Sequence, residues 1–65
     1  MQIPNHLYNL FQGYWKRGLY KGMTYGDAFY QFLHNYPLFD PVEAQSLLGN
    51  SDFKAIEAWI QARLS

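Results

Sequence analysis

Apolar side chains recur along this chain at the spacing of a helix face, in four separate stretches. The first runs from about residue 6 to residue 18, where apolar positions follow the i, i+3, i+4, i+7 rule of one face, at Leu7, Leu10, Phe11 and Tyr14. Pro4 precedes the stretch, and we expect Asn5 to cap the helix. Tyr8 and Trp15 widen the apolar arc beyond what one packing contact uses.

The second stretch has the strongest start and stop signals. Thr24 is a hydroxyl N-cap three residues before Asp27, which is a variant of the capping box. Pro37 disfavours helical backbone at the residue before it, so we expect the helix to end near Asn35. The apolar stripe between these limits consists of Tyr25, Ala28, Phe29, Phe32, Leu33 and Tyr36.

Two shorter stretches follow. Asp40, Pro41 and Glu43 occupy the cap, first and third positions of a short helix that we expect to end at Gly49, with Ala44, Leu47 and Leu48 pointing inward. The last helix is expected to begin near Ser51, with Asp52 in its first turn and Arg63 in its last. Its stripe is Phe53, Ile56, Ile60 and Leu64, widened by Trp59.

No stretch shows the period-two alternation of a strand. We therefore predict an all-α fold, a compact bundle of four short helices in a single domain covering residues 1–65. Hydrophobic residues make up 49% of the chain and charged residues 15%, a balance that favours folding over disorder. Aromatic residues reach 20%, which predicts an aromatic-rich core with some aromatic surface left for a partner.

The absence of cysteine excludes disulfides, thiolate zinc sites and cysteine nucleophiles. No apolar run approaches the ~18 residues of a membrane span, and the first residues lack the features of a signal peptide. We therefore expect a cytoplasmic protein that does not interact with membranes.

Candidate chemistry is sparse. His6 and His34 are the only imidazoles, and Asp27 lies seven residues before His34 on the same predicted helix side. A metal site usually needs three or four converging ligands, and no motif of a metalloprotease, serine hydrolase or phosphate loop is present. We expect exposed or capping histidines, no cofactor, no metal, no small-molecule substrate and no enzymatic activity.

The segment from residue 14 to residue 21 interleaves aromatic and basic side chains, a pattern found in interaction hot spots and in single-strand nucleic-acid sites. We predict a partner-binding patch built by the aromatic residues Tyr8, Trp15 and Tyr20, with a basic rim of Lys16, Arg17 and Lys21. In the alternative interpretation, Tyr14 and Leu19 belong to the core and the cations are merely solvated. A third possibility, that Tyr8 and Trp15 are themselves internal, also stays open.

Charge decides which partner is favoured. Residues 1–22 contain three basic side chains and no acidic one, whereas residues 23–65 contain five acidic and two basic ones, so the chain is neutral overall. Nucleic-acid modules normally carry a strong positive excess. We therefore expect a protein-protein interaction module, acting as a homodimer or on a larger protein, with a nucleic-acid-associated regulator using residues 14–21 as the alternative.

Two segments give the chain a general resemblance to small helical proteins of bacteria and phages. They are the stretch from Met23 to Phe29 and the block from Asp40 to Ile60. The resemblance is one of style and assigns neither a function nor a residue role. We expect the interaction module to be a small accessory or regulatory protein.

Overall fold

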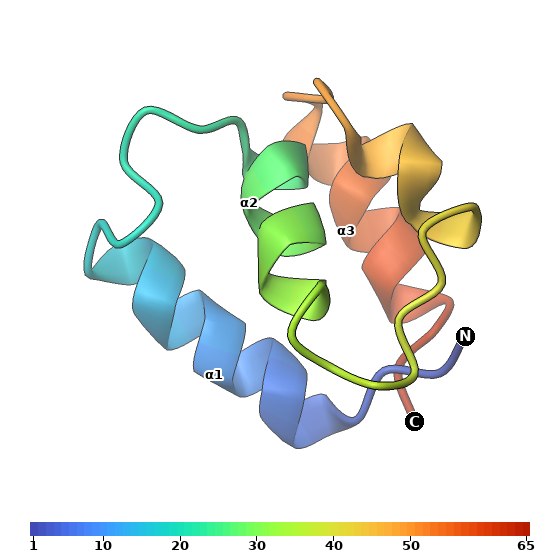
Figure 1. Cartoon of the computed structure of the whole chain (residues 1–65). Coiled ribbons are helices and arrows are strands. Elements are labelled where there is room, and N and C mark those ends of the chain that lie inside the picture. Colours follow the sequence, from blue (N-terminus) through green and yellow to red (C-terminus); the bar gives the residue numbers. More distant parts are fainter.

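The computed structural model describes all 65 residues as three α-helices and one short 3-10 helix, which pack into a globule of 26 × 22 × 20 Å (Figure 1). These are α1 (Asn5–Lys16), α2 (Tyr25–Leu33), the 3-10 helix η1 (Glu43–Leu47) and α3 (Phe53–Gln61). The prediction of an all-helical fold is confirmed. The prediction of four helices in a bundle is wrong, because only three of the predicted segments form α-helices.

The third segment is a short 3-10 helix with two buried side chains, three residues apart. Ala44 and Leu47 are both buried, and their separation matches the three-residue turn of a 3-10 helix. Leu48 then adopts extended backbone, and Gly49 takes a left-handed φ of 67°. The predicted inward position of Leu48 is therefore wrong, since this residue is 49% exposed.

Side-chain caps start α2 and α3. The Thr24 hydroxyl accepts a hydrogen bond from the Asp27 N–H at 3.1 Å, which confirms the predicted cap. The Asp52 carboxylate accepts from the Ala55 N–H at 3.2 Å. Asp52 therefore caps α3 rather than lying inside its first turn.

The limits of α1 differ from the prediction at both ends. Asn5 is its first residue rather than its cap, and Pro4 occupies the cap position without a side-chain hydrogen bond. The helix ends at Lys16, and Gly18 leaves the helical region with a φ of 78°. Leu10, predicted to face the core, is exposed instead.

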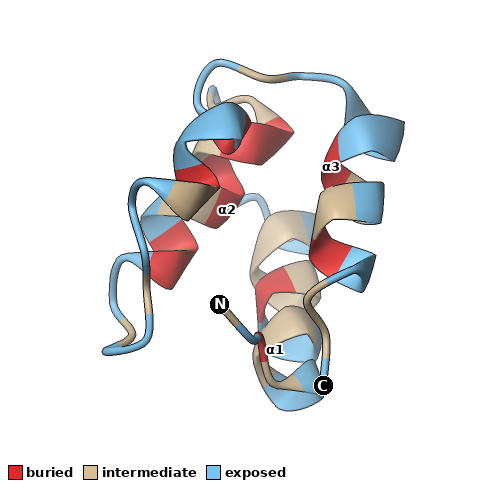
Figure 2. Ribbon diagram, turned by 90° about the vertical axis from the view of Figure 1, so that its right-hand side faces the viewer, coloured by how far each residue is buried: buried red, intermediate tan, exposed pale blue.

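Helix α2 lies at the centre of the molecule and contacts α1, η1 and α3. Figure 2 shows the buried positions concentrated on α2 and on the sides of α1 and α3 that face it. One cluster of eleven residues forms the core: Ile3, Phe11, Tyr25, Ala28, Phe29, Phe32, Leu33, Ala44, Leu47, Ile56 and Ile60. Four of the eleven are aromatic, so the predicted aromatic-rich core is confirmed.

Phe11 connects α1 to this core. Its ring is fully buried and meets the ring of Phe29 edge-on, with the centroids 4.8 Å apart. Phe32 and Tyr25 on α2 lie at 5.3 and 5.6 Å from the same ring. Such aromatic pairs add about 0.5–1.5 kcal/mol each to the energy of burial, so this one side chain holds much of α1 in place.

The two ends of the chain lie side by side. Ile3 forms a single parallel bridge with Leu64, in which the Ile3 N–H donates to the Arg63 carbonyl at 2.7 Å and the Ser65 N–H donates to the Ile3 carbonyl at 3.1 Å. Leu64 therefore lies beyond α3 rather than on its predicted stripe. This bridge places residues 1–4 in extended conformation beside the start of α1 (Figure 1).

Candidate functional site

The three aromatic residues of the predicted patch are half-buried and pack on the interior. The Trp15 ring meets the Tyr25 ring edge-on at 5.0 Å and stacks on Phe11 at 6.3 Å. The Tyr20 ring lies 5.7 Å from Phe11. Tyr8 faces α3 and not the loop after α1, so the structure does not bring it together with the other two. Each of these three aromatic side chains therefore contributes packing to the fold.

The three predicted rim cations are fully accessible. Lys16 and Arg17 end α1, and Lys21 lies in the loop that follows; all three are exposed. None of them forms an ion pair or a side-chain hydrogen bond within the molecule. The Arg17 guanidinium lies 5.9 Å from the centre of the Tyr14 ring, which keeps it close to the surface of α1.

Leu19 is the exposed apolar residue that lies between these cations in the sequence. It is 62% exposed, so the interpretation that placed it in the core is wrong. The turn that carries it is ordered, because its N–H donates to the Tyr14 carbonyl at 3.2 Å. Gly18 and Gly22, on either side, have φ values of 78° and 87° that other residues rarely adopt. We call Lys16, Arg17, Leu19 and Lys21 the basic end.

The acidic side chains behave in the opposite way. Every carboxylate of the chain accepts at least one hydrogen bond from within the molecule: Asp27, Asp40, Glu43, Asp52 and Glu57. Among the five Lys and Arg side chains, only Arg63 has such a partner. Of the four Lys and Arg side chains that have no internal hydrogen-bond partner, three lie at the basic end.

Glu57 is the centre of a hydrogen-bond network that joins the three α-helices. Its carboxylate accepts from the hydroxyls of Tyr8 at 2.8 Å and Tyr25 at 2.6 Å. Gln12 in turn donates to the Tyr25 hydroxyl at 2.6 Å. Burial, followed by the hydrogen bond to Glu57, raises the pKa of Tyr8 to about 12 and raises the pKa of Tyr25 as well. Both hydroxyls therefore remain protonated donors at neutral pH.

Glu43 organises a second network near the chain ends. The α-amino group of Met1 donates to Glu43 Oε1 at 2.6 Å, and Arg63 Nε donates to Oε2. These two hydrogen bonds, the first being the stronger cause, hold the pKa of Glu43 below its ordinary value. Arg63 also stacks on Trp59 at 4.0 Å. Arg63 therefore lies beyond the end of α3, and its charge is paired with Glu43 within the molecule.

The histidines lie apart from these networks. His34 is exposed and packs beside the rings of Phe39 and Tyr30, at 4.8 and 5.5 Å. Asp27 directs its carboxylate at the Gly49 N–H, 2.8 Å away, and makes no hydrogen bond to His34. No group of three or more His, Asp and Glu side chains comes together in the molecule.

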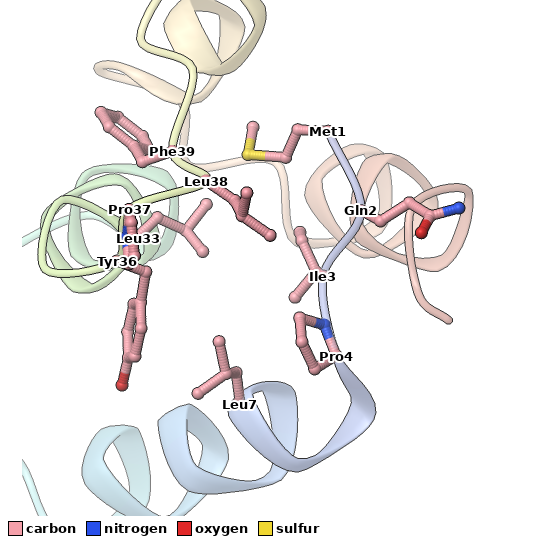
Figure 3. A pocket seen from close by; sticks show the side chains of 10 residues that line it. All are labelled: Met1, Gln2, Ile3, Pro4, Leu7, Leu33, Tyr36, Pro37, Leu38 and Phe39. Carbon is pink, nitrogen blue, oxygen red and sulfur yellow. The ribbon is translucent and has the colours of Figure 1, made fainter.

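An apolar groove that the sequence analysis missed lies at the other end of α1 (Figure 3). It holds about 200 Å³ between residues 1–4, the start of α1 and the loop after α2, with walls that include Ile3, Pro4, Leu7, Leu33, Leu38 and Phe39. The Gln2 amide and the Tyr36 hydroxyl point away from the hollow in Figure 3. In the sequence, the one indication of this groove was the apolar pair Leu38–Phe39, which follows Pro37 in a segment expected to be a loop.

No helix has the length and apolar character needed to cross a membrane. Comparisons with protein-family models, with curated proteins and with solved structures give no significant match for this chain.

Proposed function

We propose that this chain is a non-enzymatic protein-interaction module, of an accessory or regulatory kind, that contacts its partner through the basic end. The observation that carries the proposal is the exposed Leu19 within a short segment that also carries three exposed cations without an internal partner. An apolar centre with a polar rim is the usual anatomy of a protein interface.

The distribution of charge supports a partner with acidic side chains. No carboxylate of the molecule forms an ion pair with the three cations of the basic end, so these cations are available to an acidic partner. The half-buried Trp15 and Tyr20 lie behind this surface and stiffen it, because both rings pack on Phe11. Tyr8, two helical turns away and bound to Glu57, does not take part in the proposed contact.

The alternative, a nucleic-acid-associated regulator using residues 14–21, draws on the same cations. It also requires aromatic faces on which bases can stack. The rings of Trp15 and Tyr20 instead direct part of their surface toward Phe11 and Tyr25. The exposed apolar side chain of the basic end, Leu19, is aliphatic and offers no ring for stacking, which favours a protein partner.

A photo-crosslinking amino acid at position 19 tests the proposal, in cells that produce the protein. Position 48 is the matched control, because Leu48 is a similarly exposed leucine on another face. We expect protein adducts from position 19 that weaken when Lys16 and Arg17 are changed to Glu, and few from position 48. Equal adducts from both positions, or adducts with nucleic acid only, contradict the proposal.

A further inference from the structure

We infer that a site for an anionic oxygen group of the partner, a carboxylate or a phosphoryl group, lies beside the basic end. It consists of one guanidinium group and three phenol hydroxyls, those of Arg17, Tyr14, Tyr20 and Tyr36. We call the three tyrosines the tyrosine cluster. This inference rests on the proposed function, since it names the chemical group that the partner presents at this end of the molecule.

The tyrosine cluster is assembled on one pair of buried rings, Phe11 and Phe32, whose centroids are 5.3 Å apart. Tyr14 in α1 and Tyr36 after α2 pack on Phe32, at 6.0 and 5.3 Å. Tyr20, in the loop between these helices, lies 5.7 Å from Phe11. Figure 3 shows the Tyr36 side chain extending toward α1 with the hydroxyl at its tip. Three parts of the chain therefore bring their tyrosines to the same side of the core.

The turn after α1 holds Tyr20 in this position. Gly18 reverses the direction of the chain with its φ of 78°. The Leu19 N–H then donates to the Tyr14 carbonyl at 3.2 Å, and the Met23 N–H donates to the Tyr20 carbonyl at 3.1 Å. The ring of Tyr20 is thereby folded back onto the core beside the last turns of α1.

The three hydroxyls of the tyrosine cluster are available as donors. The hydroxyls of Tyr8 and Tyr25 form hydrogen bonds within the molecule, but those of the cluster do not. Because no buried side-chain oxygen or nitrogen lacks a partner, these three hydroxyls are in contact with solvent. Burial, followed by the charges of ionised Tyr14 and Tyr36, raises the pKa of Tyr20. The Tyr20 hydroxyl thus stays protonated at neutral pH, and the three side chains lie within electrostatic reach of one another.

The charges around the tyrosine cluster suit an anion. The exposed Arg17 guanidinium lies 5.9 Å from the centre of the Tyr14 ring, and the exposed Lys21 follows Tyr20 directly. The segments that build the cluster, residues 10–24 and 33–37, contain no acidic side chain. A guanidinium group presents two parallel N–H donors to a carboxylate or a phosphate, and a hydrogen bond to an ionised acceptor is stronger than one to a neutral acceptor.

The molecule itself shows how tyrosine hydroxyls hold a carboxylate. Glu57 accepts hydrogen bonds from Tyr8 at 2.8 Å and from Tyr25 at 2.6 Å. The tyrosine cluster offers the same kind of donor three times, together with a cation, but no carboxylate of the chain binds there. An acidic group of the partner completes this second arrangement, while Leu19 makes the apolar contact of the basic end.

Nuclear magnetic resonance tests the inference through titrations with sodium phosphate and with sodium acetate at pH 7, with sodium chloride keeping the ionic strength constant. We expect the backbone amides of residues 14–21 and 36 to shift and to saturate, with a dissociation constant of roughly 1–10 mM. Saturation by acetate assigns the site to a carboxylate, and saturation by phosphate alone assigns it to a phosphoryl group. Both results support the inference.

Variants identify the donors. Arg17→Gln removes the guanidinium group, and the triple change of Tyr14, Tyr20 and Tyr36 to Phe removes the three hydroxyls but keeps the rings that pack on the core. Each is expected to weaken binding of the ion at least about tenfold, since hydrogen bonds to charged groups are the stronger ones. Tyr30→Phe is the matched control, because Tyr30 is also half-buried but packs on Phe39, away from the cluster. It is expected to leave binding unchanged.

Several results overturn the inference. Shifts that grow without saturation for both ions show that no site exists. A triple Phe variant that binds as tightly as the unmodified chain shows that the hydroxyls are not donors, and an equal loss in Tyr30→Phe shows that the effect is not local. Far-UV circular dichroism checks the fold of each variant, and Tyr36→Phe alone carries the test if the triple variant unfolds. If neither ion binds while position 19 still crosslinks to a protein, only this inference falls and the proposed function stands.

Discussion

Helices α1 and α2 are both amphipathic, but they differ sharply in how much of their surface is buried. Six of the nine residues of α2 are buried, whereas Phe11 is the one buried residue among the twelve of α1. α2 contacts every other helix, while α1 contacts chiefly α2. Helix α2 therefore organises the core, whereas α1 packs against it through one fully buried side chain and several partly buried ones.

That attachment leaves the end of α1 available for a partner. Phe11 and the hydrogen bond from Tyr8 to Glu57 hold the first two-thirds of the helix. Beyond Trp15 the chain is exposed as far as Leu19. Residues that carry little of the folding energy are free to serve binding, and the basic end meets this condition.

The largest effect that we expect comes from Gly26→Ala in α2. A Cβ atom at this position lies 2.1 Å from the Leu47 carbonyl oxygen and 2.6 Å from that of Asn50, both of which are backbone atoms. The Gly26 N–H also donates to the Asn50 carbonyl at 3.0 Å, so separating the segments breaks this bond. We expect a loss of about 3 kcal/mol or more, most of the ~3–5 kcal/mol that so small a core supplies. Urea unfolding followed by circular dichroism measures it.

The same substitution in α1 is the matched control. A Cβ atom at Gly13 meets nothing closer than the Arg17 guanidinium at 3.6 Å. Alanine is favoured over glycine inside a helix by up to ~1 kcal/mol, so Gly13→Ala is expected to stabilise the protein slightly. Similar losses from both substitutions contradict the contrast between the two helices.

Trp15→Ala tests how much the last turn of α1 contributes to the core. The indole packs on Phe11 and Tyr25 but is half-buried, so its removal is expected to cost about 2 kcal/mol, below the ~3–5 kcal/mol of a fully buried aromatic residue. Leu10→Ala, at an exposed position of the same helix, is expected to cost under about 0.5 kcal/mol. If Trp15→Ala lowers the unfolding free energy no more than Leu10→Ala does, the Trp15 side chain does not contribute to the core.

High pH tests the network that joins α1 to α3. A tyrosine whose pKa is higher in the folded protein stabilises the fold below its unfolded pKa of ~10, and this contribution disappears as the pH rises through the folded value. For Tyr8 the loss is therefore expected between pH 10 and about 12. Unfolding free energies measured across this range are expected to fall less steeply for Tyr8→Phe. An unchanged slope shows that the Tyr8 hydroxyl ionises equally easily in both states.

The smallest effect on stability is expected at the basic end. Leu19→Ser alters an exposed turn and is expected to change the unfolding free energy by less than about 0.5 kcal/mol. Its effect on the affinity for the proposed protein partner is expected to be large by comparison, at least tenfold, because it removes the apolar side chain of the basic end. A variant that loses both stability and partner binding shows that Leu19 acts through the fold.

The sequence predicted those features of the fold that depend on nearby residues. The cap at Thr24 was predicted because its hydrogen bond joins residues three apart. The 3-10 form of η1 was not, since it accompanies a close approach of Leu47 to Gly26, which is distant in sequence. Leu10 was misplaced because helical periodicity defines an apolar arc without showing which part of it meets the core.

The candidate surfaces were predictable in part for the same reason. Lys16, Arg17 and Lys21 are exposed, as a basic rim requires, but Leu19 was assigned to the interior in one interpretation because turn geometry cannot be read from hydrophobicity. The groove combines residues 1–7 with residues 33–39. Only the folded chain brings these two segments together.

Native-state hydrogen exchange tests most directly the claim that α2 holds the fold while the end of α1 remains free for a partner. Amides of α2, such as those of Phe29 and Phe32, are expected to exchange only through global unfolding. Amides at the end of α1 and in residues 17–22 are expected to exchange through local opening, at a clearly lower free energy. Equal protection across α1 and α2 contradicts the claim, because both helices then belong to one cooperative unit.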